Sequence, residues 1–474
     1  MKTPAGLTDR QTVHDSVLQG DTWGSILALV QVDSIGKACM EAGYFYKYKD
    51  KLPVGFLGLV DDIVGITEVG HKAQQLNSLI NLKTAEKSLQ FGVNKCKAMI
   101  VGKSNHNYLH SKIMVDKWEV NYTDNLNNGN PVLEESFQGL VEIEKVKTQT
   151  YLGFVISSSG DNMAHIRSAK SKGTGVISKI LSKLKSLNLQ KYYFECAMIL
   201  LNAILRPSLL FACDMIYNMK ESEIRQLERV EEHYLRKVLN TGKGCPIVQL
   251  YLEMGHTPAR IEIQKMRCLF LHYILQQNET STVNKMFKLQ LEMPTRGDWA
   301  STCIQDLKEF KIESSLEEIK MMSKYTFSKL LRNKANERAI KYLTEKQRVK
   351  GKKIQYLKIE MAEYLSPCNT ELSIEEKQKL FAIRNQMTNF EMKSYEKPQN
   401  CVCGKIESIE HFYSCEILNK KENEISFQNI YSNNIKNQIK IFRRIQNVLQ
   451  KRENIIVNST PCDPMGSATF SSIG

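Results

Sequence analysis

Apolar residues follow two different periods in the first part of the chain. Residues 21–42 have helical spacing, which predicts one helix, and the apolar positions are Ile26, Val30, Val32, Ile35 and Cys39. The next runs, GYFYKY, PVGFLGLV and IVGIT, are short, apolar and broken by turn residues, so they predict antiparallel strands. The pattern further predicts a helix over residues 71–91, a buried strand over 97–102 and more strands over 111–158.

After Gly160 the period changes. Nearly all of residues 164–365 is helical in pattern, with breaks near Pro207, Gly244, Gly255 and Pro294. The predicted fold class is therefore α+β, with strands and helices in the first third and a largely helical part after it. Residues 457–474 are small and polar, which predicts disorder.

Length and composition fit a folded intracellular protein. A chain of 474 residues predicts two to four packed units, and 42% hydrophobic residues suffice for buried cores. There is no apolar run of roughly 18 residues that would predict a membrane span. The first residues also lack the apolar core of a secretory signal. We therefore expect a nuclear or cytoplasmic protein that is not secreted, has no membrane partner and keeps its cysteines reduced.

The net charge of +14 favours a polyanionic partner, because each phosphate contact releases a condensed counterion. Two segments concentrate the positive charge. Residues 162–191 contain no acid, and their cations are Arg167, Lys170, Lys172, Lys179, Lys183, Lys185 and Lys191. Residues 324–353 are rich in Lys and Arg against Glu337 and Glu345. Each run taken alone fits a solvated helix face as well as it fits a nucleic-acid surface.

Asp61 and Asp62 form an adjacent carboxylate pair between two apolar strands. Neighbouring carboxylates repel each other unless a cation compensates them, and their hard oxygen ligands suit magnesium. Phosphoryl transfer by two metals about 3.5–4 Å apart needs carboxylates placed in this way. Asp is also a favoured turn residue, so a structural turn is the alternative for this pair taken alone.

Further motifs stand in a definite order around this pair. Gln19-Gly20 precedes the first long helix, where Gly20 lets a backbone approach a nucleotide or template strand. The Asp-Asp hairpin, a second helix and a lysine-bearing segment with Lys95 follow. In this order, over roughly residues 10–420, the chain resembles the reverse transcriptases of non-LTR (LINE-type) retrotransposons.

The resemblance implies RNA-templated DNA synthesis on an RNA template and a DNA primer. It assigns magnesium and catalysis to Asp61 and Asp62. The other residues that it assigns are Gln19, Gly20 and Lys95 at the template and nucleotide, and Tyr151, Leu152 and Gly153 at the primer grip. The segments Ile204–Pro207 and Leu250–Gly255 resemble the thumb region of the same family.

The implied domains are a partial palm and four further segments. They are residues 1–160 for the palm, 161–260 for a helical thumb, 261–395 for a helical connector, 396–420 for a zinc-knuckle-like unit and 421–474 for a basic helix with a disordered tail.

The family pattern has one departure in this chain. A first metal-binding aspartate, in a pattern like Asp-x-x-Lys-Ala-Phe-Asp, is expected well before Gln19-Gly20. Asp9 and Asp15 lack an apolar strand around them, and Asp33 lies on the predicted helix. We therefore expect that the fingers and the first palm strand are missing, and that the chain alone is crippled as an enzyme by orders of magnitude.

A cysteine and histidine cluster stands near the C-terminus. Cys401, Cys403, His411 and Cys415 lie within 15 residues, and three thiolates with one imidazole form a tetrahedral zinc site. Unrelated thiols are the alternative. The preceding Leu380–Met387 resembles the segment before the Cys-Cys-His-Cys knuckle of retrotransposons with a restriction-like endonuclease. The acidic pattern of that nuclease is absent after Cys415, so we expect no nuclease.

Residues 434–452 predict a basic amphipathic helix. Its apolar face contains Ile435, Ile439, Phe442, Ile445 and Leu449. RNA and a membrane surface are both conceivable partners for this helix, but we expect it to dock on its own protein.

Two other functions remain open beside reverse transcription. The first is a non-catalytic nucleic-acid-binding protein that uses the basic helical surface and the zinc knuckle. The second is an inert relic of a degraded element.

The departure from the family pattern yields a first prediction. The purified chain should extend a DNA primer on an RNA template poorly or not at all in magnesium, because two-metal chemistry lacks one of its three carboxylates. Incorporation of labelled nucleotide measures this. Robust magnesium-dependent extension would show that the expected truncation is wrong.

Overall fold

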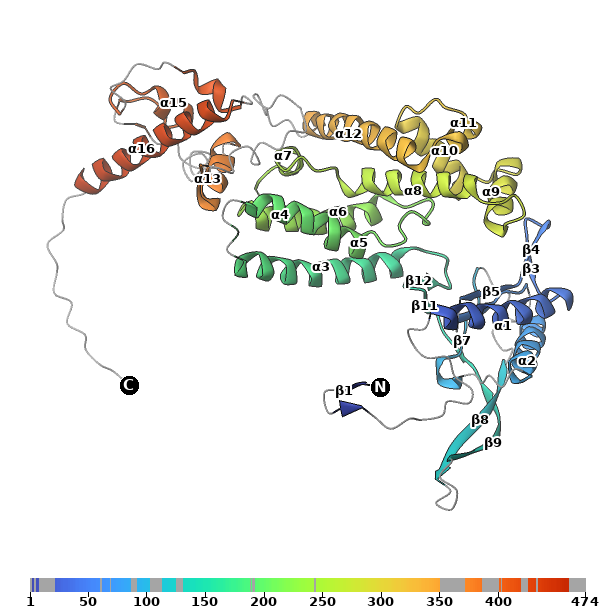
Figure 1. The fold of residues 1–474 in the computed structure, drawn as a ribbon. Helices are drawn as coiled ribbons and strands as arrows, with labels where there is room; N and C mark the ends of the chain where they lie inside the picture. Colours follow the sequence, from blue (N-terminus) through green and yellow to red (C-terminus); the bar gives the residue numbers. More distant parts are fainter. Residues whose placement is uncertain are drawn as a thin grey trace, which may run out of the picture. The chain divides into compact units, whose positions relative to one another are not determined.

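The computed structural model describes most of the chain as helices and small sheets (Figure 1). The described residues are 2–3, 6–7, 22–59, 62–68, 70–86, 92–102, 113–124, 131–187, 189, 192–242, 244–349, 371–385, 400–401, 403–418, 425–431 and 434–459. The fold is α+β and mostly helical, with small antiparallel sheets, which confirms the predicted class at this level. Two compact units are present, Met1–His165 with Gln277–Pro294, and Ile166–Gln276 with Thr295–Gly474.

The first unit contains the described strands. Its elements are β1 (Lys2–Thr3), β2 (Gly6–Leu7), α1 (Thr22–Glu41), β3 (Tyr46–Tyr48), β4 (Leu52–Val54), β5 (Phe56–Leu59), β6 (Asp62–Gly65), α2 (Gly70–Ala85), η1 (Val93–Lys95), β7 (Lys97–Ala98), β8 (Met114–Asp124), β9 (Pro131–Glu142), β10 (Glu144–Lys145), β11 (Thr148–Tyr151), β12 (Phe154–Ser157) and α9 (Thr282–Glu292). Consecutive strands pair as antiparallel hairpins, except that β7 pairs with β10 in parallel.

Helix α1 lies very close to strand β5 because each element has a glycine at the contact, Gly36 in α1 and Gly58 in β5. A Cβ on Gly58 of β5 would be 2.4 Å from Cγ1 of Val32, and a Cβ on Gly36 of α1 would be 2.8 Å from the ring of Phe56. Real Cβ atoms do not approach other atoms so closely, so larger side chains at either glycine would push the helix off the hairpin.

Helix α2 packs on the same face of the β5–β6 hairpin. Gly65, which pairs with Phe56, has a Cβ position 2.9 Å from Leu76 of α2. The core between the two helices is formed by Ile35, Cys39, Leu76 and Ile80. The β5–β6 hairpin, whose strand β6 begins at Asp62, is therefore supported by two helices.

One predicted strand is shorter and less buried than its apolar pattern indicates. Residues 97–102 form only the two-residue strand β7, and Val101 is 61% exposed, so the prediction of a buried strand over this range was wrong. Strand β10 supplies only a two-residue partner, which leaves the rest of this run without sheet pairing among the described residues.

Helix α9 belongs to the first unit although it lies far along the sequence. Gln290 of α9 donates a hydrogen bond to the hydroxyl of Tyr48 in β3 (2.9 Å), and Glu292 pairs with Lys51 at 3.9 Å. The hairpin β3–β4 is thus connected to a helix more than 200 residues away in sequence.

The second unit is helical. Its elements are α3 (Met163–Ser186), α4 (Tyr193–Leu200), η4 (Leu201–Leu205), α5 (Arg206–Leu209), α6 (Glu221–Val238), α7 (Ile247–Glu253), α8 (Ala259–Gln276), α10 (Trp299–Glu309), α11 (Leu316–Met321), α12 (Lys324–Val349), α13 (Ile374–Arg384), α15 (Ile409–Ser414), η6 (Phe427–Tyr431) and α16 (Ile435–Ser459). In α3, Gly173 permits close packing, since its Cβ would be 2.9 Å from Leu209 and 3.3 Å from Val230.

The segment Ile204–Pro207 places an arginine in the interior. A π-turn over Leu201–Leu205 precedes Pro207, a residue that cannot donate a backbone hydrogen bond within the helix. The Arg206 side chain is 10% exposed, and its Nε donates to Oε1 of the fully buried Glu231 at 3.0 Å. Its NH1 donates to Glu262 at 3.2 Å, and its NH2 donates to Thr257. One side chain thereby connects α5, α6 and α8.

The segment Leu250–Gly255 supplies a second buried charge. Glu253 of α7 pairs with Arg384 of α13, and neither side chain has any exposed area. Arg384 also donates to Oε1 of Gln438 in α16 at 3.2 Å. Gln378 of α13 donates to the carbonyl of Val238 at 2.9 Å. Helix α13 is therefore held to α6, α7 and α16 by polar contacts.

The buried Arg206–Glu231 pair predicts a large stability effect. Arg206→Met would leave the Glu231 carboxylate buried without its guanidinium, and we expect a loss of about 3–5 kcal/mol in the free energy of unfolding, measured by urea denaturation. The double variant Arg206→Met with Glu231→Leu should regain part of the loss because no uncompensated charge stays buried. A single variant as stable as the wild type would contradict this account.

Candidate functional site

The β5–β6 hairpin brings one predicted catalytic residue to its tip. The register pairs Leu59 with Asp62 and Gly58 with Ile63, so Asp62 begins strand β6. Asp62 is exposed to solvent. The other predicted catalytic residue, Asp61, lies outside the described residues, and so do Gln19 and Gly20.

The predicted primer-grip residues form the tip of a second hairpin. Strands β11 and β12 pair with Tyr151 opposite Phe154, so Leu152 and Gly153 are the two turn residues. Both have positive φ, 47° and 82°, as a type I′ turn requires. The ring of Phe154 stacks on His165 within the first unit, with ring centroids 4.4 Å apart.

The Asp62 carboxylate on the β5–β6 hairpin affects the pKa of Tyr151 on the β11–β12 hairpin. Burial raises the pKa of the Tyr151 phenol, and the nearby Asp62 carboxylate raises it further. The phenol therefore stays protonated at neutral pH and can act as a hydrogen-bond donor. The carboxylate of Asp62 thus influences the pKa of Tyr151, a residue 89 positions away in sequence.

Lys95 is placed differently. It ends the short helix η1 and is exposed, and within the described part of the chain it makes no hydrogen bond or ion pair with Asp62 or Tyr151.

The four predicted zinc ligands do converge. The ligand atoms of Cys401, Cys403, His411 and Cys415 all lie within 4.8 Å of one another, an arrangement that can hold a metal ion. The Sγ atoms of Cys401 and Cys415 are 3.8 Å apart, and Sγ of Cys403 is 3.2 Å from Nε2 of His411.

Local backbone structure builds this cluster. The amide of Gly404 donates to the carbonyl of Cys401 (2.8 Å), and Gly404 has φ 85°, so a side chain would be strained in this turn. Ser408 caps α15 by accepting a hydrogen bond from the amide of His411 (3.0 Å), which sets the position of the imidazole.

The protonation states in the cluster suit metal binding in part. A backbone hydrogen bond from Lys405 is the main cause that lowers the pKa of Cys403, and burial lowers the pKa of His411, so that its imidazole stays neutral. Burial raises the pKa of Cys401 to about 11, a change that a bound cation would have to overcome.

The cluster is part of a small hydrophobic core. Cys401 and Cys415 are buried with residues of α13, α15, η6 and α16, and the apolar face of α16 faces this core. All five residues predicted for that face, Ile435, Ile439, Phe442, Ile445 and Leu449, contribute to it, which confirms that the helix docks on its own protein. Arg452 of α16 also makes a two-pronged ion pair with Glu407 (2.8 and 2.6 Å).

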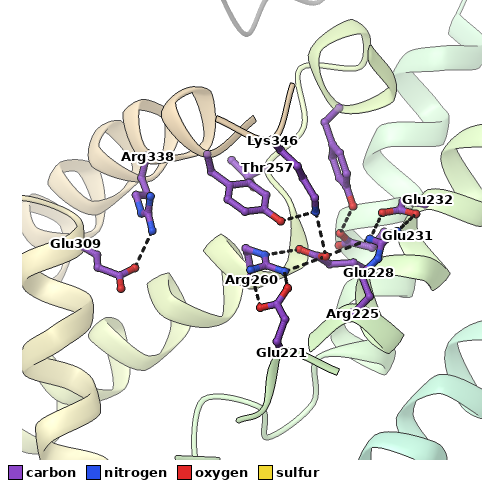
Figure 2. Close-up of polar contacts among 12 residues, drawn as sticks. Glu221, Arg225, Glu228, Glu231, Glu232, Thr257, Arg260, Glu309, Arg338 and Lys346 are labelled. Atoms are coloured by element: carbon purple, nitrogen blue, oxygen red, sulfur yellow. Dashed lines mark hydrogen bonds and ion pairs between the residues drawn. The ribbon is translucent and has the colours of Figure 1, made fainter. Parts of the chain in front are cut away.

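The two cation-rich segments differ in their ion pairing. Along α12, Arg338 pairs with Glu309 (2.9 Å) and Lys346 pairs with Glu228 (3.8 Å), and Lys334 and Lys341 pair with neighbours on their own helix. Figure 2 shows Glu228 of α6 as the meeting point of Arg225, Arg260 and Lys346. Much of the charge of α12 is therefore compensated inside the protein.

The cations of helix α3 are exposed to solvent. No ion pair within the described residues involves its six cations, which are all exposed: Arg167, Lys170, Lys172, Lys179, Lys183 and Lys185. Lys191 lies outside the described residues. At about 100° per residue, Lys172, Lys179 and Lys183 form one row along the helix. Arg167, Lys170 and Lys185 form a second row, and Ser171, Gly175, Ser178 and Ser182 lie between the two.

This arrangement leaves the positive charge of α3 accessible to solvent on two sides of the helix. At about 100° per residue the two cationic rows lie about 160° apart, so they border the small residues on opposite sides of the exposed surface of a helix about 36 Å long. The sequence alone did not distinguish α3 from α12, because the partners of Arg338 and Lys346 lie on other helices, 29 and 118 positions away.

No protein-family model matches the chain, and no curated protein matches it either. Among the described residues, no helix combines the length and the apolar character that crossing a membrane would require.

The convergent cluster predicts metal binding by the purified chain. We expect one equivalent of a divalent ion per chain by elemental analysis, and its loss in His411→Ala and in Cys415→Ser, because each removes a ligand. Metal loss should also speed proteolysis within α15 and α16, which share the core of the cluster. Cys196→Ser, outside the cluster, is the matched control. Unchanged metal content in both ligand variants would contradict the assignment.

Proposed function

We propose that this chain is a reverse-transcriptase-type protein derived from a non-LTR retrotransposon. The observation that supports this function best is the exposed Asp62 at the start of β6, whose carboxylate influences the pKa of Tyr151 on a second hairpin of the same unit. Asp62 begins β6 on a hairpin supported by α1 and α2. Its carboxylate raises the pKa of the Tyr151 phenol on the β11–β12 hairpin. The order of helix, hairpin and helix agrees with the palm that the motifs resemble.

In this proposal each residue has a defined task. Asp61 and Asp62 would hold magnesium through their carboxylate oxygens, and the ion would supply activation of the attacking hydroxyl and stabilisation of the leaving oxygen. The exposed carboxylate of Asp62 is accessible for such a role. The protonated phenol of Tyr151 donates a hydrogen bond to the primer backbone, and Leu152 and Gly153 shape the turn that presents it. Gln19, Gly20 and Lys95 retain the roles that the resemblance implies.

Zinc is the metal that we propose for the C-terminal cluster. In a tetrahedral site with Zn–S bonds of about 2.3 Å, two sulfurs are separated by about 3.8 Å. The Sγ atoms of Cys401 and Cys415 are 3.8 Å apart. Three thiolates and one imidazole leave no open coordination position, so this zinc would be structural and would stabilise the core around α16.

A second candidate function is nucleic-acid binding without catalysis. It is favoured by the cations of α3, which are exposed and form no ion pair among the described residues. Because this surface does not involve Asp61 or Asp62, it would work whether or not the chain catalyses synthesis.

The catalytic proposal predicts metal binding at the hairpin tip. With Mn²⁺ as a spectroscopic substitute for magnesium, Asp61→Ala with Asp62→Ala should weaken binding about tenfold or more, measured by electron paramagnetic resonance. Binding of an RNA–DNA primer duplex should survive unchanged. Asp33→Ala with Glu41→Ala removes two exposed acids of α1 and serves as control. Equal Mn²⁺ affinity in all three proteins would reject the magnesium site and favour the non-catalytic function.

The basic surface of α3 predicts a salt-dependent interaction. The triple variant Lys172→Ala, Lys179→Ala and Lys183→Ala should reduce the slope of log affinity against log salt by about 2 for single-stranded RNA, at about 0.7 per lost phosphate contact. Fluorescence anisotropy with labelled RNA measures this slope. Lys334→Ala, Arg338→Ala and Lys341→Ala on α12 remove the same charge from cations that are already ion-paired, so they should leave the slope unchanged. Equal effects of the two variants would mean that net charge, and not α3, governs binding.

A further inference from the structure

Helix α16 has one buried apolar face and one exposed cationic face. Residues 435–452 contain six cations and no acid. The apolar face packs into the core that contains the Cys-His cluster, where Ile439, Phe442 and Ile445 are buried. The ends of this face are fixed by polar contacts, since Gln438 accepts from Arg384 and Arg452 binds Glu407.

The opposite face is exposed and cationic. Its six exposed positions are Lys436, Lys440, Arg443, Asn447, Gln450 and Lys451. At 100° per residue they fall within about 100° of arc, and they extend for about 22 Å along the helix. No ion pair within the described part of the chain involves Lys436, Arg443 or Lys451. Arg452, which is half-buried, pairs with the buried carboxylate of Glu407.

The side chains of this face favour a nucleic-acid strand over an anionic lipid bilayer as the partner. A basic amphipathic helix binds a bilayer by inserting its apolar face between the lipids. Here that face is already buried against α15 and η6, so only the polar face is available. Cations interspersed with Asn447 and Gln450 amides match the phosphate and sugar oxygens of a nucleic-acid strand, which accept hydrogen bonds from both groups.

We propose that the exposed face of α16 is a second nucleic-acid-binding surface, separate from α3, which contacts the sugar–phosphate backbone of a single strand. The Cys-His cluster acts on this surface indirectly, because it completes the core on which α16 lies. The inference rests on the proposed nucleic-acid partner, and its test separates the two.

The test uses the full chain and a labelled single-stranded RNA of mixed sequence. Lys436→Ala, Arg443→Ala and Lys451→Ala remove three exposed cations without touching the core, so the unfolding transition should not change. We expect the slope of log affinity against log salt to fall by about 2 relative to the wild type. The α12 triple variant is the control of equal charge, and the α3 triple variant tests the first surface in parallel.

Each result decides the proposal. A reduced slope for the α16 variant with an unchanged slope for the α12 control supports it. If the α16 variant binds RNA as the wild type does while the α3 variant is weakened, the inference fails and the nucleic-acid function stands. If the wild type shows no salt-dependent RNA binding, both fail. Binding to anionic phospholipid vesicles that depends on these three cations, in place of RNA binding, would also overturn the proposal.

Discussion

Buried carboxylates on α6 determine where the positive charge of this protein is available. Glu228 is almost fully buried and must be compensated, so it attracts Arg225, Arg260 and Lys346 from three helices. A carboxylate in the interior without partners would cost several kcal/mol, which makes these pairings obligatory once α6, α8 and α12 pack together. The cations of α3 face water and have no such partner among the described residues. Two cation-rich segments of the sequence thereby differ in the structure, because several cations of α12 are ion-paired and those of α3 are exposed.

The same constraint connects the C-terminal elements to the rest of the second unit. Glu253 and Arg384 are buried together, and Arg384 reaches onward to Gln438 of α16. Around α16, the Cys-His cluster and the apolar residues form one core, so a metal at the cluster and the position of the helix depend on each other. A core of this size buries little apolar surface, so a metal bound at the cluster would add to its folding free energy.

The first unit depends on close packing more than on charge. Gly36 and Gly58 let α1 approach β5, and this contact fixes the base of the hairpin whose strand β6 starts at Asp62. Tyr151 comes near the same carboxylate from a separate hairpin whose turn needs positive φ at Leu152 and Gly153. The reverse-transcriptase function remains a proposal that this geometry supports.

The sequence by itself determined what depends on local spacing. Apolar periodicity predicted α1, the β3–β4 and β5–β6 hairpins, the helical second part and the buried face of α16, and ligand spacing predicted the Cys-His cluster. It overestimated the strand at residues 97–102, since burial depends on neighbours that a local pattern does not contain. Only the tertiary structure decided which cations are paired, that α9 joins the first unit, and that the carboxylate of Asp62 influences the pKa of Tyr151. These facts rest on contacts between residues far apart in the chain, and no local period of hydrophobic or charged residues encodes them.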